Sequence, residues 1–199
     1  MESLIFLNEK RDKTVKARMC ANGSSQRAYI AQEDVSSPTA TLEAIITTGV
    51  IDAKQRRDVM TLDIPNAFVQ TKIPIKGDKI ILKIHGGQLV NILLELCPGV
   101  YDDYVCYKGK NKVVYVRMLK ALYGMLISSI LYYKKFRKDI ESVGFEVNSH
   151  DICITNQTVN GKQQTATWHV DDLKSSHIDP KVNDHFTLYG AKILMEATI

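Results

Sequence analysis

The sequence lacks the features that mark secreted, membrane-spanning or metal-stapled proteins. Its four cysteines form no Cys-x-x-Cys pair, so we expect reduced thiols, with neither a disulfide framework nor a zinc site. No apolar run approaches the roughly 20 residues of a membrane-spanning helix, and no basic segment followed by an apolar block opens the chain. Internal repeats and low-complexity segments are also absent from the sequence. We therefore expect an intracellular protein that is neither secreted nor embedded in a membrane.

What is present is an ordinary globular composition. The 199 residues are 45% hydrophobic and 24% charged, which suffices for one large or two small domains with a buried core. The formal net charge of +4 is mild, so it permits a polyanionic partner without requiring one. Composition alone therefore leaves the function open.

The first 30 residues predict a β-hairpin. Residues 4–7 and 14–20 have the composition and alternation of strands, and a charged turn separates them. Because side chains alternate along a strand, Lys16 and Arg18 share one face of the second strand. Two cations on one face can hold a phosphate. They can equally be solvated charges at a sheet edge.

Two stretches have the apolar spacing of helices. The first opens at Ser37-Pro38, carries apolar residues on one face as far as Ala53, and ends within the cation-rich residues 54–58. The second spans residues 128–143, and Gly144 is placed to end it. Four cations form a basic face on the second helix, namely Lys134, Lys135, Arg137 and Lys138. A solvated face and a contact with nucleic acid both explain such a pattern.

The remaining patterns predict strands and tight turns. Strands are expected over residues 59–64, 80–84, 89–94, 112–117, 152–159, 163–170 and 173–178. Gly86 and Gly87 lie between the second and third of these strands and favour a hairpin there. Asn160-Gly161 lies between the fifth and sixth and favours a type I′ hairpin turn. The chain thus predicts an α+β fold with an antiparallel sheet and packed helices.

Three aspartates at strand ends are the candidates for chemistry. One predicted strand ends at Asp63, and another ends at Asp171-Asp172. Adjacent carboxylates repel each other, and a hard divalent cation such as Mg²⁺ relieves that repulsion. The alternatives are a solvated hairpin turn for the adjacent pair and a helix cap or turn residue for Asp63.

Carboxylates from two strands suit two-metal phosphoryl transfer. This chemistry needs acids from different strands to meet where two Mg²⁺ ions, about 3.5–4 Å apart, clamp the attacking and leaving oxygens. A sheet that places the strand of Asp63 beside that of Asp171 would bring such acids together. A minor alternative is an iron facial triad built on His169-x-Asp171, with His177 or His185 as the third ligand.

A series of short segments occurs in an order that is typical of one enzyme family. In chain order they are Lys16-Ala17-Arg18, Ser37-Pro38-Thr39-Ala40, Asp63-Ile64-Pro65-Asn66-Ala67-Phe68, Lys120-Ala121-Leu122-Tyr123-Gly124 followed by Ser128, Val143-Gly144-Phe145, Ser149-His150-Asp151-Ile152-Cys153 and His169-Val170-Asp171-Asp172. This ordered set resembles the reverse transcriptases of Ty1/copia-type retrotransposons. The resemblance spans roughly residues 5–186.

The resemblance implies a polymerase core of palm and fingers with RNA-directed DNA polymerase activity. Asp63 and Asp171 match the metal-binding aspartates of the family, the backbone carbonyl of Ile64 assists them, and Asp172 completes the acidic cluster. The implied cofactors are two Mg²⁺ or Mn²⁺ ions. The implied partners are an RNA template, a DNA primer and deoxynucleoside triphosphates, in a cytoplasmic virus-like particle or in the nucleus.

The resemblance also implies a nucleotide pocket. Phe68, which from the residues alone is an ordinary core side chain, matches the steric gate beneath the incoming sugar. Tyr123 and Gly124 would line the pocket. Lys16 and Arg18 would hold the triphosphate.

The chain departs from the family at several positions. Around Ser128 the family usually carries Gln, Pro, Arg and Trp, whereas this chain has Ile127, Ser129, Ile130 and Tyr132. His169 replaces the usual Tyr or Phe, and residues 187–199 are expected to form an atypical tail. The alternative to an active polymerase is therefore a non-catalytic, nucleic-acid-binding remnant of a retrotransposon polyprotein.

The expected organisation is one truncated reverse transcriptase domain without a thumb. The fingers are expected at about residues 1–58 with part of 71–118, and the palm at about 59–70 and 119–186. The sequence leaves the oligomeric state open.

Overall fold

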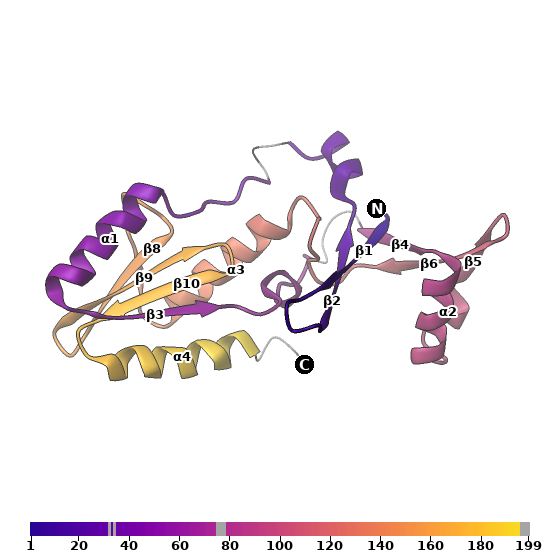
Figure 1. Ribbon diagram of the computed structural model, residues 1–199. Coiled ribbons are helices and arrows are strands. Elements are labelled where there is room, and N and C mark those ends of the chain that lie inside the picture. The colour runs from indigo at the N-terminus through magenta and orange to yellow at the C-terminus, as the bar shows by residue number, and fades with distance from the viewer. Residues whose placement is uncertain (32, 34, 75–78, 196–199) are drawn as a thin grey trace. The chain divides into compact units, whose positions relative to one another are not determined.

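The protein consists of two compact units. The structure is a computed structural model that describes residues 1–31, 33, 35–74 and 79–195, with side chains described as far as residue 188 (Figure 1). Unit 1 comprises Met1–Val35 and Lys72–Ser128, and unit 2 comprises Ser36–Thr71 and Ser129–Ile199. The strand pairs within the sheets are antiparallel, so the mixed α+β prediction is confirmed. None of the helices in these described stretches is long and apolar enough to cross a membrane.

Unit 1 contains a two-stranded hairpin and a three-stranded sheet with one covering helix. Its elements are β1 (Ser3–Glu9), β2 (Val15–Ala21), η1 (Gly23–Ala28), β4 (Ile81–His85), α2 (Gly87–Leu96), η4 (Asp102–Tyr104), β5 (Val105–Lys108) and β6 (Asn111–Arg117). β1 pairs with β2, which confirms the N-terminal hairpin, and the larger sheet has the order β4-β6-β5. Val90 of α2 packs with Leu82 and Val114 of this sheet in the core of the unit.

The hairpin predicted over residues 80–84 and 89–94 is wrong in its second half. Gly86, at a φ of 104°, ends the first strand, and the chain then forms helix α2. The apolar residues Leu89, Val90 and Leu93 recur at the spacing of a helix face and pack into the same core. β4 pairs instead with β6, because a helix satisfies its own backbone groups and leaves the edge of β4 to another strand.

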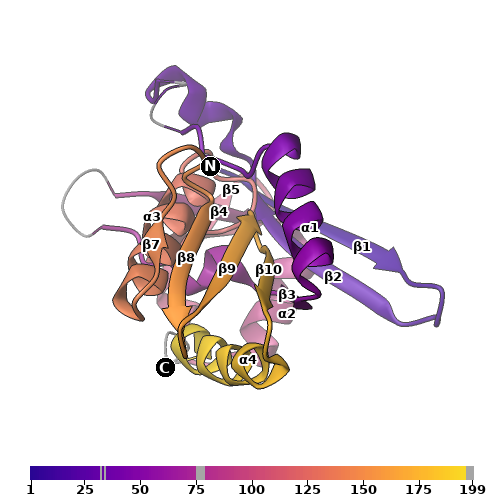
Figure 2. The ribbon, with the colours of Figure 1, turned by 90° about the vertical axis from the view of Figure 1, so that its left-hand side faces the viewer.

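Unit 2 is a five-stranded sheet covered by helices. Its elements are α1 (Leu42–Gln55), β3 (Asp58–Asp63), η3 (Ala67–Gln70), α3 (Ser128–Ser142), β7 (Glu146–Val147), β8 (Ile154–Val159), β9 (Lys162–His169), β10 (Asp172–His177) and α4 (Pro180–Met195). The strand order is β3-β10-β9-β8-β7. Figure 2 looks at β8, β9 and β10 and shows α1 on one side of these strands and α3 on the other. Helix α4 continues through residues 187–195.

The apolar core of unit 2 lies between the sheet and helices α3 and α4. Trp168 of β9 and Phe136 of α3 meet edge to face, with ring centroids 5.2 Å apart. Phe186 of α4 lies 5.4 Å from Phe145, centroid to centroid. The helix predicted over residues 128–143 is thereby confirmed, as is the hairpin of β8 and β9 that the Asn-Gly pair predicts.

Helix α1 begins later than its sequence predicts. Its N-terminal cap is Thr41 rather than Ser37-Pro38, and the Thr41 hydroxyl oxygen accepts a hydrogen bond from the N–H of Ala44. The Asp151 carboxylate in turn accepts hydrogen bonds from the N–H and hydroxyl of Thr41, at 3.0 and 3.1 Å. A residue 110 positions away thus helps to set the start of the helix, which local sequence cannot show.

The apolar face of α1 is not its buried face. The residues of α1 that are buried are Thr48 and Asp52. Lys174 of β10 donates hydrogen bonds from Nζ to Asp52 Oδ2 at 2.7 Å and to Thr48 Oγ1 at 3.1 Å. Arg57, just after the helix, donates to Thr165 Oγ1 of β9 at 3.0 Å. Because this face of the sheet carries polar side chains, the helix turns its own polar side toward it.

Candidate functional site

Two of the three predicted aspartates lie directly opposite each other in the sheet of unit 2. In the antiparallel pairing of β3 with β10, Asp63 is the partner of Asp172, and Asp172 is also the partner of His169 on β9. Side chains of such cross-strand partners share one face, with Cβ atoms about 4.5–5.5 Å apart. Both carboxylates are exposed. The neighbouring strands that the sequence argument requires are therefore present, and the acid directly opposite Asp63 is Asp172 rather than Asp171.

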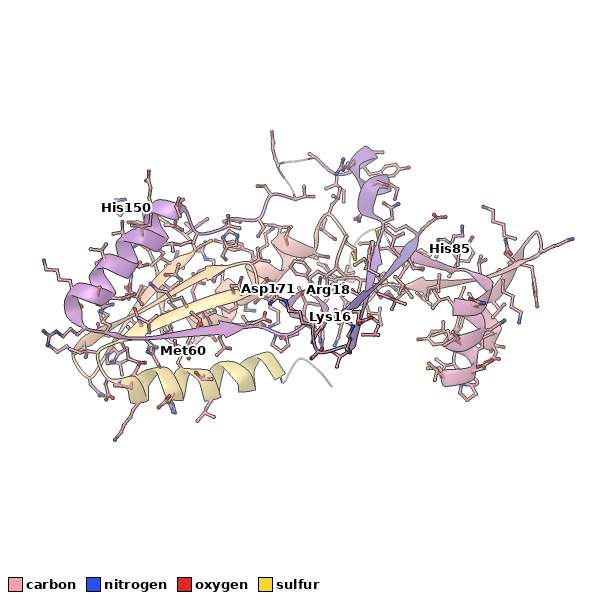
Figure 3. All side chains as sticks on the ribbon, viewed as in Figure 1. Lys16, Arg18, Met60, His85, His150 and Asp171 are labelled. Carbon is pink, nitrogen blue, oxygen red and sulfur yellow. The ribbon has the colours of Figure 1, made fainter. Side chains whose placement is uncertain are left out.

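Asp171 occupies the tight turn between β9 and β10. The turn consists of Val170 and Asp171, and the backbone carbonyl of Asp171 accepts a hydrogen bond from the N–H of Ile64 at 3.0 Å. Ile64 is only 1% exposed, so the turn is tied to a residue anchored in the core. Val170 has a φ of 59°, which is strained for a β-branched residue. The end of β3 and the turn are thus joined at one sheet edge, where Figure 3 labels Asp171.

The donor set at this edge fits a hard divalent cation in its chemistry. Asp63 and Asp172 offer exposed carboxylate oxygens from adjacent strands, which are the ligands that Mg²⁺ prefers. Among the residues that the structure describes, no group of three or more His, Cys, Asp or Glu is arranged to hold a metal ion. The three aspartates therefore share one edge without forming a closed ligand cage.

A pocket adjoins the paired carboxylates on the face that α1 partly covers. It is lined from the sheet by Asp63, Asp172 and Lys174, and from the helix by Ile45 and Thr48. The cavity has a volume of about 360 Å³, which lies within the range of small-molecule sites. The carboxylates thus border a space that can admit a ligand.

Phe68 packs beside the site. It lies in η3, is half-buried, and packs against the unit 2 core. Its ring meets that of Tyr132 edge to face, with centroids 6.0 Å apart. The prediction that Phe68 packs in the core therefore holds for the part of the ring that meets Tyr132. The rest of the side chain is accessible, so the steric-gate role stays a proposal.

Tyr123 and Gly124 lie in unit 1, where the backbone of β2 approaches them closely. The N–H of Ala21 donates to the carbonyl of Tyr123 at 2.7 Å. Gly124 has a φ of 87°, and a Cβ built on it would lie 2.1 Å from the carbonyl oxygen of Ala21. Gly23 approaches from the other side, and its own Cβ would lie 2.2 Å from the Gly124 carbonyl oxygen. Only glycine fits at position 124, for reasons of backbone packing alone.

Lys16 and Arg18 lie on β2, also in unit 1, and both are exposed (Figure 3). In the β1–β2 ladder Lys16 is the partner of Asn8, and Arg18 is the partner of Phe6. The two cations therefore share one face, as the alternation of the strand predicts, together with an aromatic ring that is 55% exposed.

The basic face of α3 is partly neutralised by the helix itself. Lys135 forms an ion pair with Asp139 at 2.5 Å, and Arg137 forms one with Glu141 at 3.0 Å. Lys134 and Lys138 are exposed. These two lysines are therefore the stronger candidates for a contact with phosphate.

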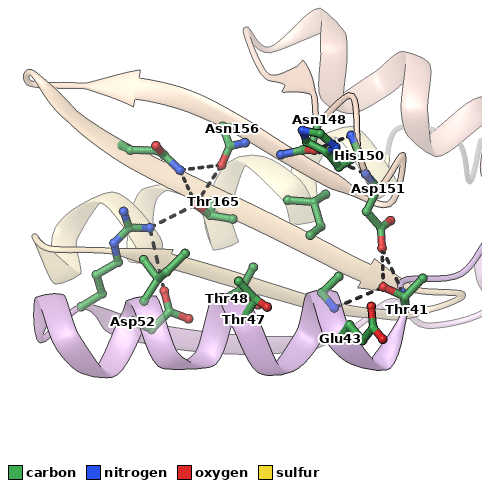
Figure 4. Close-up of a pocket in the computed structure, with 15 residues that line it drawn as sticks. Thr41, Glu43, Thr47, Thr48, Asp52, Asn148, His150, Asp151, Asn156 and Thr165 are labelled. Atoms are coloured by element: carbon green, nitrogen blue, oxygen red, sulfur yellow. Dashed lines mark hydrogen bonds and ion pairs between the residues drawn. The ribbon is translucent and has the colours of Figure 1, made fainter.

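Several contacts that organise unit 2 were not predicted from the sequence, although Asp151 belongs to one of the ordered segments described above. Figure 4 shows the pocket between α1 and the sheet, with the Thr41–Asp151 contact at one end and the contacts of Asp52 and Thr165 at the other. Asp52 and Lys174 are separated by 122 positions, and nothing local marks either as a partner. Asp52, a charged residue between the apolar residues Ile51 and Ala53, is a signal that could have been followed.

The ionisable groups near this pocket are shifted by burial and hydrogen bonding. Burial alone would raise the pKa of Asp151, but hydrogen bonds from Thr41 and from the N–H of Cys153 outweigh it and hold the pKa below its usual range. Burial, helped by the nearby Asp151 charge, raises the pKa of Cys153 to about 12. The Cys153 thiol therefore stays protonated and unreactive at neutral pH.

Comparison with known proteins identifies one family. The model of the family described as reverse transcriptase (RNA-dependent DNA polymerase) matches residues 5–192. No curated protein and no solved structure matches the chain. The family match continues past residue 186, where the motif resemblance ends, and so includes part of the tail in α4.

Proposed function

Because the chain belongs to the reverse transcriptase (RNA-dependent DNA polymerase) family, we propose that it is the polymerase core of a copia-type element, with unit 2 as the palm and unit 1 as the fingers. The observation that supports this assignment most directly is the cross-strand pair of Asp63 and Asp172 beside the Asp171 turn. The proposed reaction is RNA-directed DNA synthesis, in which a primer hydroxyl attacks the α-phosphate of a deoxynucleoside triphosphate and releases diphosphate.

The aspartates at the sheet edge are the proposed metal ligands. Asp63 and Asp171 would hold two Mg²⁺ or Mn²⁺ ions, assisted by the carbonyl of Ile64, and Asp172 would complete the acidic cluster. The bound ions would lower the pKa of the primer hydroxyl and neutralise the leaving diphosphate. The hydrogen bond from Ile64 to the Asp171 carbonyl supports this role, because it fixes the turn relative to β3.

Other residues are proposed to position the substrates. The ring of Phe68 would lie under the incoming sugar and exclude a 2′-hydroxyl, while Tyr123 and Gly124 would line the nucleotide pocket. Lys16 and Arg18 would hold the triphosphate. The RNA template and DNA primer would be held partly by the basic residues of α3, of which Lys134 and Lys138 are not neutralised by the ion pairs described above.

Primer extension tests the proposal. The chain should extend a DNA primer on an RNA template when Mg²⁺ or Mn²⁺ is supplied. Asp171→Asn should reduce synthesis on the order of 10²-fold or more, which is the scale on which loss of one charge-stabilising group acts. Asp184→Asn, at an exposed position of α4, is the control and should leave synthesis unchanged. Equal synthesis by the Asp171 variant and the unsubstituted chain would refute the assigned site.

A second candidate is a non-catalytic nucleic-acid-binding remnant. It is favoured by the finding that the described residues contain no ready group of three metal ligands. This candidate predicts no synthesis with any metal, together with binding to an RNA–DNA hybrid that weakens steeply as salt rises, because phosphate contacts release counterions. Binding that is insensitive to salt would refute it.

A further inference from the structure

Helix α1 leaves an apolar stripe uncovered. Leu42, Ile46 and Val50 recur every four residues on this helix, and they are 71%, 57% and 62% exposed. Ile45, at one margin of the stripe, is 40% exposed. A stripe of this length on one helix is more typical of a contact surface than of a solvated face.

The stripe is not needed to hold α1 in its own unit. The opposite side of the helix supplies its attachment through the bonds of Thr48 and Asp52 to Lys174 and the bond of Thr41 to Asp151. These contacts satisfy polar groups, and they leave the apolar side free. A helix with one polar, docked side and one apolar, open side needs another cover for the open side.

The charges beside the stripe indicate what that cover is. Glu43 lies in the first turn of α1 and Lys54 in the last. At 100° per residue these two positions project from the same edge of the stripe, one at each end of the helix. If a second α1 runs antiparallel along the first, Glu43 of each copy faces Lys54 of the other. The pattern is therefore complementary to itself in the way that a two-fold interface requires.

The centre of the helix permits a close approach. Gly49 lies at the middle of the stripe, and a Cβ built on it would meet nothing within 4 Å. Pairing Glu43 with Lys54 of the second copy places the two-fold axis between Thr48 and Gly49. The helix backbones could therefore cross at the position where this chain has no side chain.

We propose that α1 is a self-association surface, on which a second copy of this chain docks with its own α1 antiparallel to the first. The contact goes beyond the polymerase assignment and does not depend on it. A helix of 14 residues is about 21 Å long, which supplies only part of the roughly 800 Å² per partner of a stable interface. The association is therefore a weak one, with half-association expected at micromolar protein.

Sedimentation velocity over a hundredfold range of protein concentration tests the surface. The unsubstituted chain should pass from monomer to dimer, and Ile46→Lys should shift the midpoint at least tenfold toward higher concentration. Leu188→Lys is the matched control, because Leu188 lies on α4 and is 72% exposed. Unchanged Trp168 fluorescence confirms that each variant is folded. A chain that stays monomeric throughout, or a dimer that Ile46→Lys leaves intact, overturns the proposal.

Charge reversal tests the antiparallel arrangement. Glu43→Lys and Lys54→Glu should each weaken self-association, because each variant places like charges opposite each other at both ends of the helix pair. An equimolar mixture of the two variants should form a heterodimer at least as readily as the unsubstituted chain forms its dimer. Failure of the mixture to associate better than either variant alone overturns the antiparallel contact.

Discussion

The ion cluster beneath α1 allows a sharp prediction about stability. Lys174 donates to Asp52 at 2.7 Å, and the side chain of Asp52 is only 5% exposed. In Lys174→Met the apolar stem is kept and the charge is lost, so Asp52 keeps only Arg57, whose Nη1 lies 3.8 Å from Oδ1. We expect unit 2 to lose stability, because a buried carboxylate then lacks its closest cation.

The expected size follows from the burial of the two partners. Removing one partner of a fully buried ion pair costs about 3–5 kcal/mol. Lys174 retains 20% of its side-chain exposure, and Arg57 still compensates part of the charge, so we expect about 2 kcal/mol. Lys135→Met is the matched control: the Lys135 side chain is 23% exposed, but its partner Asp139 is 26% exposed. Exposed pairs at this helical spacing contribute about 0.3–0.5 kcal/mol.

Urea unfolding followed by fluorescence measures both variants. Trp168 is the single tryptophan, it is 2% exposed in the core of unit 2, and it therefore reports the unit that contains both ion pairs. The double variant Asp52→Asn with Lys174→Met should lose less unfolding free energy than the two single variants lose together. Both charges are removed in the double variant, so neither remains buried without the other. If Lys174→Met costs no more than Lys135→Met, the reasoning from burial is refuted.

Two further predictions concern a glycine and an aspartate. Gly124→Ala should destabilise unit 1 by about 3 kcal/mol, since the new Cβ combines a left-handed backbone with a collision against Ala21. Gly109→Ala, at a φ of 63° in open space, is the control and should cost about 1 kcal/mol. Amide hydrogen exchange in β2 measures both variants, and an equal loss of protection in the two would contradict this account. The pKa of Asp151 is lowered in the folded state, so its charge stabilises the fold at neutral pH, and that stabilisation is lost as the pH falls below about 4. Asp151→Asn should therefore lower the urea midpoint at pH 7 and reduce its further fall between pH 5 and pH 3, and parallel acid profiles would contradict the role assigned to the carboxylate.

The strands that position the site could be predicted because their signals are local. Alternation and β-branched residues mark β9, and Asn160-Gly161 fixes the turn before it, with φ values of 51° and 71°. Placing the two strand ends side by side then brings Asp63 to the end of the sheet where Asp171 and Asp172 lie. What the sequence could not supply is the register of β3 against β10, since that register is fixed by contacts between segments more than 100 positions apart.

The error at α2 has a different cause. Leu89 to Leu94 is a short apolar run, and such a run is compatible with a strand or with a buried helix. The glycines before it suit a hairpin turn as well as a helix start. Packing decides between them, because Leu89, Val90 and Leu93 fit the core of unit 1 as one face of a helix, while β6 pairs with β4. Only the tertiary structure contains that information.

Helix α1 shows how a correct pattern can support a wrong inference about burial. Its spacing indicates one apolar and one polar side, and both sides exist. The assumption that the apolar side faces the core fails, because Lys174 and Thr165 make the facing side of the sheet polar. The polar side of the helix docks instead, because Asp52 supplies the carboxylate that the Lys174 ammonium beneath the helix would otherwise lack. The exposed apolar stripe is therefore a consequence of the polar sheet face beneath α1, and it is available for an interface.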